Sequence, residues 1–451
     1  MTDLEGFAQR RIIEGWGRQD IVSALTELVR EFKDWEMEKA SAFSEAVYEE
    51  VKTSLAYVDL KDRFLKNLLD YPKTGVAMGE FGVGSRGEGD FKVHRDIAEI
   101  IGEQSVVVGP GEQDDAGVVE GGGRYVTAAV DGIHSRLSRF PFLAGFHAAR
   151  ASLRDIYVMG SRPVALISDI HLADDGDIGK LYDYTAGISA VAESTGTPVV
   201  SGSTLRVGGD MVFGDRLVAA VGAVGVSETL PSARQHARAG DVILMTLGRG
   251  GGTIATTAIY SGSFDVVKET LNVDFMRSME AIHKEGLLEN IHATTDVTNG
   301  GLRGDAAEIS KASGTKLIFE ERELRKTVSR PVLTMLEALG IDYLGVSTDS
   351  LLLILPEEDA PEVMKALEKV TPVYEVGRVE KGAGAAMIKE ADGSIEELKP
   401  LFRESAYTKV KRIVGETPPE DMVEMSRALD AAKKEAQKKK EEVKRWMAKR
   451  D

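Results

Sequence analysis

Two adjacent carboxylates, Asp114 and Asp115, stand in the string "GEQDDAGVV", between glycine-rich turns and a short apolar run. Neighbouring carboxylates repel each other, so a chain that places two side by side either leaves them in solvent or supplies a cation. Acidic residues in a glycine-flanked turn are usually solvated loop residues. The alternative is that this pair holds a metal ion.

Further aspartates lie where an apolar run meets a glycine or another small residue. Asp131 stands in "AAVDGIH" and Asp155 in "SLRDIYVMGSRP", while Asp296 and Asp349 occupy similar places later in the chain. The first four aspartates fall within about forty residues, which suggests that they converge on one pocket. Converging carboxylates need a counter-charge, because their mutual repulsion otherwise raises their pKa values.

The residue types in the chain restrict which metal ion could bind. The chain has no cysteine, and it has neither a His-x-His nor a His-Glu-x-x-His spacing, so the ligands are all oxygen. Oxygen ligands favour Mg²⁺ over zinc, and Mg²⁺ held by a few carboxylates keeps positions open for phosphate oxygens. Asp114 and Asp115 are therefore predicted to hold Mg²⁺ bound to a nucleotide. The chain has no Walker A string, since "GRGGGT" lacks its lysine.

The bulk composition restricts the class of protein. The 451 residues are 43% hydrophobic and carry a net charge of −17, which predicts a globular chain of two or three domains that repels nucleic acid and anionic membranes. The absence of cysteine excludes disulfides and thiolate nucleophiles. Neither a signal peptide nor an apolar run of membrane-spanning length is present. We expect a soluble, cytoplasmic protein.

The two ends of the chain read as helical additions. Apolar residues recur at helical spacing through residues 1–72, which predicts a helical extension that serves for packing or dimerisation. Residues 418–451 form a charged helical tail, in which residues 433–450 hold nine Lys or Arg against three Glu. A basic helix can bind nucleic acid or an acidic partner. The mixture of Glu and Lys is equally typical of a solvated helix face.

Between these ends, a glycine-dense stretch predicts a lid, and alternating β-rich and helical patterns predict two α/β or α+β units. Residues 73–95 are dense in glycine and read as a mobile, glycine-rich lid. Residues 96–228 alternate β-rich runs, among them "SVVVG" and "YVTAAVDG", with helical patterns. After the connector "PSARQHARAGD", residues 236–400 form a second unit with helices expected near 274–286, 302–313, 331–339 and 360–370.

Taken together, these strings resemble the superfamily of aminoimidazole ribonucleotide synthetase, which also includes selenophosphate synthetase, thiamine-monophosphate kinase and a hydrogenase-maturation protein. "QDDAGVV" and "VDGIH" are similar to its acidic signatures, and "SLRDIYVMGSRPVAL" is similar to its aspartate-bearing helix. "SGSTLRV" occupies the place of its Gly-Gly-x-Thr turn, and "ATTDVTNGGLRGDAAEISKASG" is close to its C-domain motif. The match runs through residues 80–390 in family order.

The resemblance implies an α+β, two-domain PurM-like subunit. Its N-terminal domain forms a β-barrel shared between two chains, and its C-terminal domain is an α/β sandwich. ATP lies in a cleft with its phosphates on Mg²⁺, held at matching positions by Asp114, Asp115, Asp131 and Asp155. The turn Gly202, Ser203 and Thr204 lines the nucleotide pocket. The predicted partners are a second copy of the chain, a small-molecule substrate and a protein bound through residues 1–72 or 418–451.

Other residues have more than one interpretation. Lys92 takes the place of a lysine in the mobile segment of selenophosphate synthetase, so Lys92 and Asp131 are the predicted catalytic residues; a solvated loop lysine is the alternative. Asn299 and Gly300 in "DVTNGG" precede a helix whose free N–H groups suit an anion, or they serve turn geometry alone. His134 either contacts substrate or is structural.

The chain also departs from the family pattern. The family has an Asn shortly before the helix aspartate, whereas here Arg154 stands beside Asp155. A guanidinium there contacts phosphate or weakens metal binding. The cysteines used for carbamoyl chemistry and for selenide capture are absent. The resemblance therefore implies an ATP-dependent enzyme that transfers the γ-phosphoryl group to a small-molecule oxygen or related nucleophile. The alternative is a nucleotide-binding subunit that assists metalloenzyme or cofactor maturation.

Overall fold

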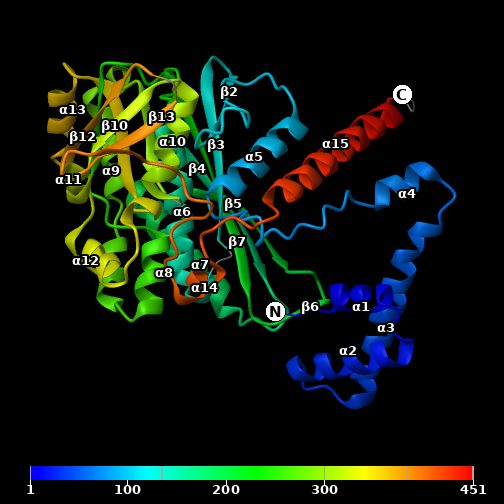
Figure 1. Ribbon diagram of the computed structural model, residues 1–451. Helices are drawn as coiled ribbons and strands as arrows, with labels where there is room; N and C mark the ends of the chain where they lie inside the picture. The colour runs from blue at the N-terminus through cyan, green and yellow to red at the C-terminus, as the bar shows by residue number, and fades with distance from the viewer. Residues whose placement is uncertain (1, 134–135, 299, 383, 449–451) are drawn as a thin grey trace.

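The protein has two mixed α/β units in contact with each other, with helices added at both ends of the chain (Figure 1). The structure is a computed structural model and describes residues 2–133, 136–298, 300–382 and 384–448. The expected two-domain α+β architecture is confirmed. No helix in these ranges has the length and apolar character needed to cross a membrane.

The first unit is built on a five-stranded sheet with the strand order β2-β3-β7-β4-β5. All neighbours are antiparallel except β4 and β5, which are parallel. One face of the sheet packs against helices that the apolar patterns predicted. The elements are β2 (Gly117–Gly121), β3 (Arg124–Ile133), β4 (Arg162–Leu172), β5 (Val199–Arg206), β7 (Leu217–Ser227), α6 (Pro141–Val158) and α7 (Gly179–Thr195).

The opposite face of this sheet is open to solvent. Val130, Gly222, Ile167 and Ser201 lie in one row across β3, β7, β4 and β5. Val130 is 70% exposed and Ile167 44% exposed, although both are apolar. Within the described residues of this single chain, the sheet stays open and does not close into a barrel.

The second unit is built on a seven-stranded sheet with the order β14-β13-β10-β12-β8-β11-β9. Helices α9 and α13 cover one face and α10 covers the other. The strands are β8 (Asp241–Thr246), β9 (Ala293–Val297), β10 (Lys316–Glu320), β11 (Ser350–Pro356), β12 (Val373–Glu380), β13 (Ala385–Lys389) and β14 (Ile395–Glu397). The helices are α8 (Gly252–Ser261), α9 (Asp274–Glu285), α10 (Gly301–Ser313), α11 (Glu321–Leu324), α12 (Arg330–Ala338), α13 (Ala360–Leu367) and α14 (Lys409–Val414).

Helix α6 joins the two units. Its apolar side chains Leu153 and Ile156 share one buried core with Val221 of β7 and with Leu244 of β8. Because α6 lies between two packed surfaces, it is buried on nearly all sides. Any polar side chain on this helix therefore needs a hydrogen-bond or ion-pair partner. The partners of the polar α6 side chains form part of the candidate site.

The N-terminal extension is a small helical bundle. Helices α1 (Leu4–Ile13), α2 (Arg18–Phe32) and α3 (Met37–Leu55) enclose their own apolar core, and α4 (Arg63–Leu69) follows. The pairing of β1 (Thr2–Asp3) with β6 (Val212–Phe213) ties the bundle to the first unit, and Phe213 is buried in the helical core. This strand pairing was not predicted.

The C-terminal tail lies along other elements of the same chain. Its helix α15 (Met422–Met447) runs beside α5 (Glu88–Ile101) (Figure 1). Lys433 Nζ lies 2.9 Å from Asp96 and 2.6 Å from Glu99, and the Trp446 ring stacks on Phe64 of α4 at 5.2 Å. Part of the basic charge of the tail is thus paired within the chain.

The elements expected in the second unit are present, because helices α9, α10, α12 and α13 occupy the four predicted positions. One expected strand is wrong. "SVVVG" contributes only an isolated bridge between Val108 and Val118. Residues 105–109 belong to no strand, since the chain bends at residues 105 and 107 and turns at residues 110–113.

Candidate functional site

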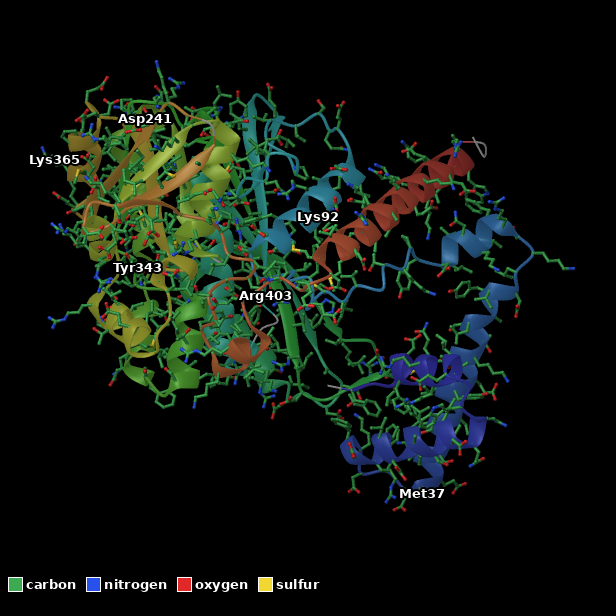
Figure 2. All side chains as sticks on the ribbon, in the orientation of Figure 1. Met37, Lys92, Asp241, Tyr343, Lys365 and Arg403 are labelled. Carbon is green, nitrogen blue, oxygen red and sulfur yellow. The ribbon has the colours of Figure 1, made fainter. Side chains whose placement is uncertain are left out.

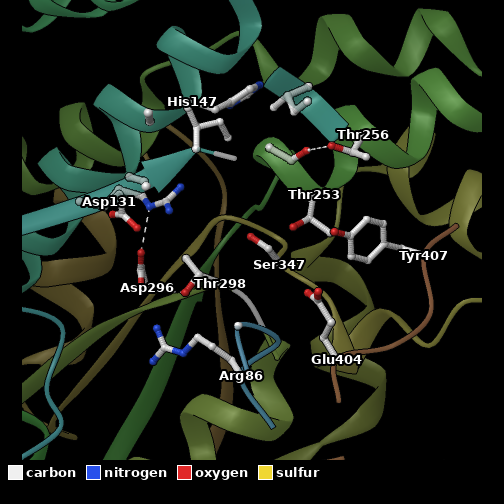
Figure 3. A pocket seen from close by; sticks show the side chains of 18 of the residues that line it. Arg86, Asp131, His147, Thr253, Thr256, Asp296, Thr298, Ser347, Glu404 and Tyr407 are labelled. Atoms are coloured by element: carbon white, nitrogen blue, oxygen red, sulfur yellow. Dashed lines mark hydrogen bonds and ion pairs between the residues drawn. The ribbon is translucent and has the colours of Figure 1, made fainter. Parts of the chain in front are cut away.

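A cavity of about 600 Å³ lies where the two units meet. Residues of β3 and α6 line it on the side of the first unit, and residues of β9 and α8 line it on the side of the second. Figure 3 shows Asp131 and Asp296 on one side of this cavity, with Glu404 and Tyr407 on the other. Its volume is within the range of small-molecule sites.

Asp131 and Asp155 form the acidic centre of the cavity. Asp131 is near the end of β3, Asp155 is on α6, and both residues line the cavity. Burial raises the pKa of both groups, and the neighbouring carboxylate of Asp296 raises them further, while Arg154 acts in the opposite direction. The pKa of Asp155 is well above its ordinary value. A bound proton or a bound cation would therefore stabilise this pair of carboxyl groups.

Asp114 and Asp115 line the same cavity but already have a counter-ion. Arg234 is 1% exposed, and its Nη2 lies 2.5 Å from Asp115 Oδ1. The backbone N–H of Arg234 donates to Asp114, and Thr295 Oγ1 donates to Asp115 at 2.8 Å. Burial nevertheless raises the pKa of Asp115 well above its ordinary value, against the effect of Arg234.

Two arginines of α6 bind the aspartates of the second unit. Arg154 donates from Nε to Asp296 at 2.9 Å, and its Nη1 pairs with Asp349. Arg150, which is fully buried, pairs with the other oxygen of Asp349. The helix thus carries both Asp155 and the guanidinium groups that satisfy Asp296 and Asp349.

Backbone strain is concentrated around this cavity. Among the described non-glycine residues, only Arg86, Gln113 and Asp349 have a positive φ, of 43°, 55° and 62°. Arg86 lines the cavity, Gln113 precedes Asp114, and Asp349 binds both α6 arginines. Such residues cost about 1–3 kcal/mol each and gather at functional sites.

Some predicted site residues lie away from the aspartates. Lys92 is on α5, and its Nζ is 2.7 Å from both Asp96 and Asp430 (Figure 2). Gly202, Ser203 and Thr204 are on β5, at the edge of the first sheet. The prediction of a turn at these residues is wrong, because they lie inside the strand β5 and pair with β4. Two strands separate β5 from β3, which places Gly202 about 14 Å from Asp131 at the usual strand spacing.

The glycine turn of the second unit does approach the site. Gly300, with φ of 85°, precedes α10, and a side chain there would lie 2.4 Å from the Arg86 carbonyl. Thr298 lines the cavity. The predicted residues Asn299 and His134 lie outside the described residues.

The sequence pattern missed two buried cations, Arg234 and Arg150, and a histidine. Arg234 stands in the segment read as a connector, and Arg150 in a helical pattern read only as apolar. His147 lines the cavity, and burial together with Arg150 and Arg154 lowers its pKa well below the ordinary value. Arg150, an arginine inside an otherwise apolar helical run, could have indicated a buried ion pair, since a buried arginine has to be paired with a carboxylate or another acceptor.

The donor set fits a magnesium site of the open kind. Within the part of the chain that the structure describes, no three His, Asp or Glu side chains already form a group that could hold a metal ion. Mg²⁺ on nucleotide phosphates uses only one or two carboxylates, with phosphate and water oxygens as the other ligands. Asp131 and Asp155, which have no ion-pair partner among the described residues, match this requirement.

Two family models match the chain in consecutive segments. The N-terminal domain of AIR synthase related protein matches residues 113–227, and the C-terminal domain of AIR synthase related protein matches residues 238–390. The chain belongs to the AIR synthase related family. The aspartates, the arginines of α6 and the cavity between the units all lie within the two matched segments.

Members of the family differ in how much of this chain they match. Protein MJ1416 of Methanocaldococcus jannaschii is 55% identical over 448 residues, which is 98% of each chain. The selenide, water dikinase of Myxococcus xanthus is 30% identical over 249 residues, covering 53% of this chain and 68% of its own. The carbamoyl dehydratase HypE of Azotobacter vinelandii is 27% identical over 234 residues, covering 49% of this chain and 64% of its own.

Solved structures show the same family fold. The hydrogenase maturation protein HypE in complex with ATP aligns with a TM-score of 0.53 at 22% identity, covering 71% of this chain and 96% of that one. AaThiL in complex with AMPPCP and TMP aligns with a TM-score of 0.53 at 19% identity, covering 70% and 98%. At this identity, the likeness establishes the AIR synthase related fold.

Proposed function

We propose that the chain binds Mg-ATP at the aspartate cluster and transfers the γ-phosphoryl group to a small-molecule oxygen or related nucleophile. The observation that carries the proposal is the pair Asp131–Asp155, whose carboxyl groups line a cavity of small-molecule size and whose pKa values are both raised. Two family folds are known in complex with ATP or with AMPPCP. The relatives named as a dikinase and as HypE support a nucleotide-dependent reaction.

Asp131 and Asp155 would hold Mg²⁺, with Asp114 and Asp115 beside them. Bound Mg²⁺ neutralises charge on the phosphates. The protein residues themselves orient the reactants. The α6 arginines fix Asp296 and Asp349, and the tight approach of Gly300 to Arg86 holds the glycine-rich segment against the cavity. Phosphoryl transfer depends on such positioning more than on a protein nucleophile.

A second chain would complete the site. The predicted nucleotide-binding segment Gly202–Thr204 is exposed on the edge strand β5, and the apolar row of Val130 and Ile167 lies on the open face of the same sheet. Pairing of two such sheets would bury this face as a shared barrel and bring this segment of one chain toward the aspartates of its partner. We therefore include a homodimer in the proposal.

One observation favours a second function. Arg234 and Arg154 already neutralise Asp115 and Asp296, where the cavity would otherwise offer free carboxylates to metal. This arrangement suits a subunit that binds the nucleotide without consuming it and that assists metalloenzyme or cofactor maturation. The helical extension supplies additional surface for a protein partner.

Calorimetry with Mg-ATP tests the proposal. We expect Mg²⁺-dependent ATP affinity in the wild type and a loss of at least about tenfold in Asp155→Asn, because a ligand to the ion is removed. Asp265→Asn is the matched control, since Asp265 is exposed and forms an ion pair with the equally solvent-exposed Lys268. ATP binding without any Mg²⁺ dependence would refute the metal site. Binding without turnover, in a screen of small-molecule acceptors, would favour the assisting subunit.

A further inference from the structure

A second cavity, of about 640 Å³, lies in the second unit at the N-terminal end of α12 (Figure 1). Among the described residues, none lines both this cavity and the cavity between the two units. The glycine-rich string "GRGGGT" lies between the two cavities, since Arg249 lines the second and Gly252 and Thr253 line the first. The proposed function leaves Arg249 and the second cavity without a role.

Backbone hydrogen bonds fix the start of α12 against this string. Gly248 N–H donates to the Thr327 carbonyl at 2.6 Å, and Ser329 N–H donates to the Gly248 carbonyl at 2.9 Å. Gly248 is itself tightly packed, because a side chain there would come within 2.3 Å of the Thr348 carbonyl oxygen. The groups at the N-terminus of α12 therefore have defined positions in the cavity wall.

Ser329 is the residue immediately before α12, and its hydroxyl has no partner. A serine at this position usually accepts a hydrogen bond from an N–H group of the helix, but the Ser329 side chain accepts none. The residue is 3% exposed and lines the cavity, and its Oγ is buried without a hydrogen-bond partner among the described residues. Since buried polar atoms are rarely left unmatched, this hydroxyl is available to a ligand in the cavity.

The end of α12 adds further donors beside Ser329. The helix has nine residues, and the N–H groups of a first helical turn have no acceptor within the helix and lie at the positive end of its dipole. Pro331 has no N–H, so Arg330 and Val332 supply these groups. The Arg330 guanidinium is exposed at the cavity and has no ion-pair or hydrogen-bond partner in the part of the chain that the structure describes.

Positive charge predominates around this end of the helix, although the whole chain has a net charge of −17. Arg249 shares its charge with Glu269 at 3.3 Å and with Asp274 at 3.4 Å. The charged residues that line the cavity are the cations Arg249, Arg325, Lys326 and Arg330 and the carboxylates Glu269 and Glu337. A helix N–H group or a guanidinium can only donate a hydrogen bond, so the ligand that fits here is an anion.

We propose that the N-terminus of α12 is a phosphate-binding site, separate from the nucleotide site, that takes inorganic phosphate or the phosphate monoester of a small molecule. The Ser329 hydroxyl, the helix N–H groups and the Arg330 guanidinium would each hold a phosphate oxygen. Donors that approach from several directions suit the tetrahedral oxygens of phosphate better than the two coplanar oxygens of a carboxylate. The site does not depend on the Mg-ATP function.

The test is calorimetry on the full-length protein without Mg²⁺ or nucleotide. Inorganic phosphate, methyl phosphate and acetate are titrated separately, and we expect acetate to bind at least about tenfold more weakly than a phosphate. Tighter binding of methyl phosphate would identify a monoester as the ligand, and tighter binding of inorganic phosphate would identify the free ion. A crystal with the tighter-binding phosphate should place an oxygen about 2.8 Å from Ser329 Oγ.

Variants locate the binding site in solution. Arg330→Gln should lower phosphate affinity at least about tenfold, because a charged donor is lost. Ser329→Ala should also weaken binding, whereas Ser329→Thr, which keeps the hydroxyl, should retain most of it. The matched control is Lys365→Gln, which removes an exposed cation from α13 (Figure 2) and should leave the affinity unchanged.

Three results would overturn the proposal. The first is an acetate affinity equal to the phosphate affinity in the wild type. The second is wild-type phosphate affinity in both Arg330→Gln and Ser329→Ala, and the third is a crystal in which phosphate occupies only the cavity between the two units. The Ser329 side chain makes no hydrogen bond in the free protein, so Ser329→Ala should stay folded, which circular dichroism checks.

Discussion

Arg154 of α6 donates a hydrogen bond from Nε to Asp296 of β9 across 2.9 Å, and so connects the two units through a buried ion pair. The same guanidinium also binds Asp349. A chain without this cation would leave two carboxylates buried at the unit interface. Arg154 therefore stabilises the geometry around the cavity, whatever it does to a bound phosphate.

Replacing Arg154 by Met should lower the free energy of unfolding by about 3–5 kcal/mol, because the buried carboxylate of Asp296 loses its ion-pair partner and Asp349 keeps only Arg150 among the described residues. Urea unfolding followed by circular dichroism measures this change. Arg139→Met is the control. Arg139 pairs with Asp215 at 2.6 Å, but both side chains are nearly half exposed, so its loss should cost no more than about 1 kcal/mol. Equal losses in the two variants would contradict the structural role of Arg154.

The stability of the protein should depend on pH through Asp305. Burial raises the pKa of Asp305 to about 7, against the opposing effect of Arg86 and Arg234. A carboxyl group with a raised pKa binds more protons in the folded chain. Its contribution to stability is therefore complete below the unfolded pKa of about 4, and is lost as the pH rises through about 7.

Asp305→Asn should remove this contribution. Between pH 4 and 7, the wild type should lose up to about 1.4 kcal/mol per pH unit relative to the variant. Urea unfolding at a series of pH values measures the difference. Glu308→Gln gives the opposite sign as a control, because the pKa of Glu308 is lowered by Arg234 and Arg86 even though burial acts to raise it. A wild type and Asp305→Asn with parallel pH profiles would show that the pKa is not raised.

Gly87→Ala should displace the neighbouring segment 401–405, whose backbone is hydrogen-bonded to Glu88 and Ser85. The added methyl group would meet the Phe402 backbone at 2.1–2.4 Å, and neither backbone can move without breaking the hydrogen bond between Glu88 N–H and the Leu401 carbonyl. Faster hydrogen exchange of residues 401–405 and new proteolytic cleavage there would report the release. Gly79→Ala is the matched control in the same glycine-rich segment, because a side chain at Gly79 meets no atom within 4 Å.

Ile167→Glu should dissociate the proposed homodimer while leaving the monomer folded. Ile167 is 44% exposed on the open sheet face, so a charge is tolerated in the single chain but would be buried between two sheets. Light scattering across a concentration series should show at least a tenfold weaker association. Phe264→Glu, at an apolar residue that is 65% exposed and lies outside this sheet, should have no effect. A wild type that is monomeric at all concentrations would refute the dimer.

Much of the candidate site could be predicted from residue types and local order. The acidic signatures led to Asp114, Asp115, Asp131 and Asp155, and the structure brings all four to one cavity. The expected two-unit architecture and family membership are also confirmed. Their roles as Mg²⁺ and ATP ligands stay a prediction, as does the cytoplasmic location.

Other expectations depended on distances that local patterns do not contain. The strand order places two strands, β7 and β4, between β3 and β5, so Gly202–Thr204 lies far from Asp131 in a single chain. Lys92 is one turn of helix from Asp96, and it pairs with Asp430, which is 338 residues away in the chain. The glycine-rich sequence around Lys92 predicts neither its contact with Asp96 nor its contact with Asp430.

The sequence by itself determined which groups are charged, where strands and helices form, and which acidic residues follow apolar runs, because these properties depend on near neighbours. Only the tertiary structure decided which cation meets which carboxylate. Arg234 reaches Asp115 and Arg154 reaches Asp296 because the connector and α6 are both packed between the two units. Burial then sets the pKa values, and burial is a property of the packed chain.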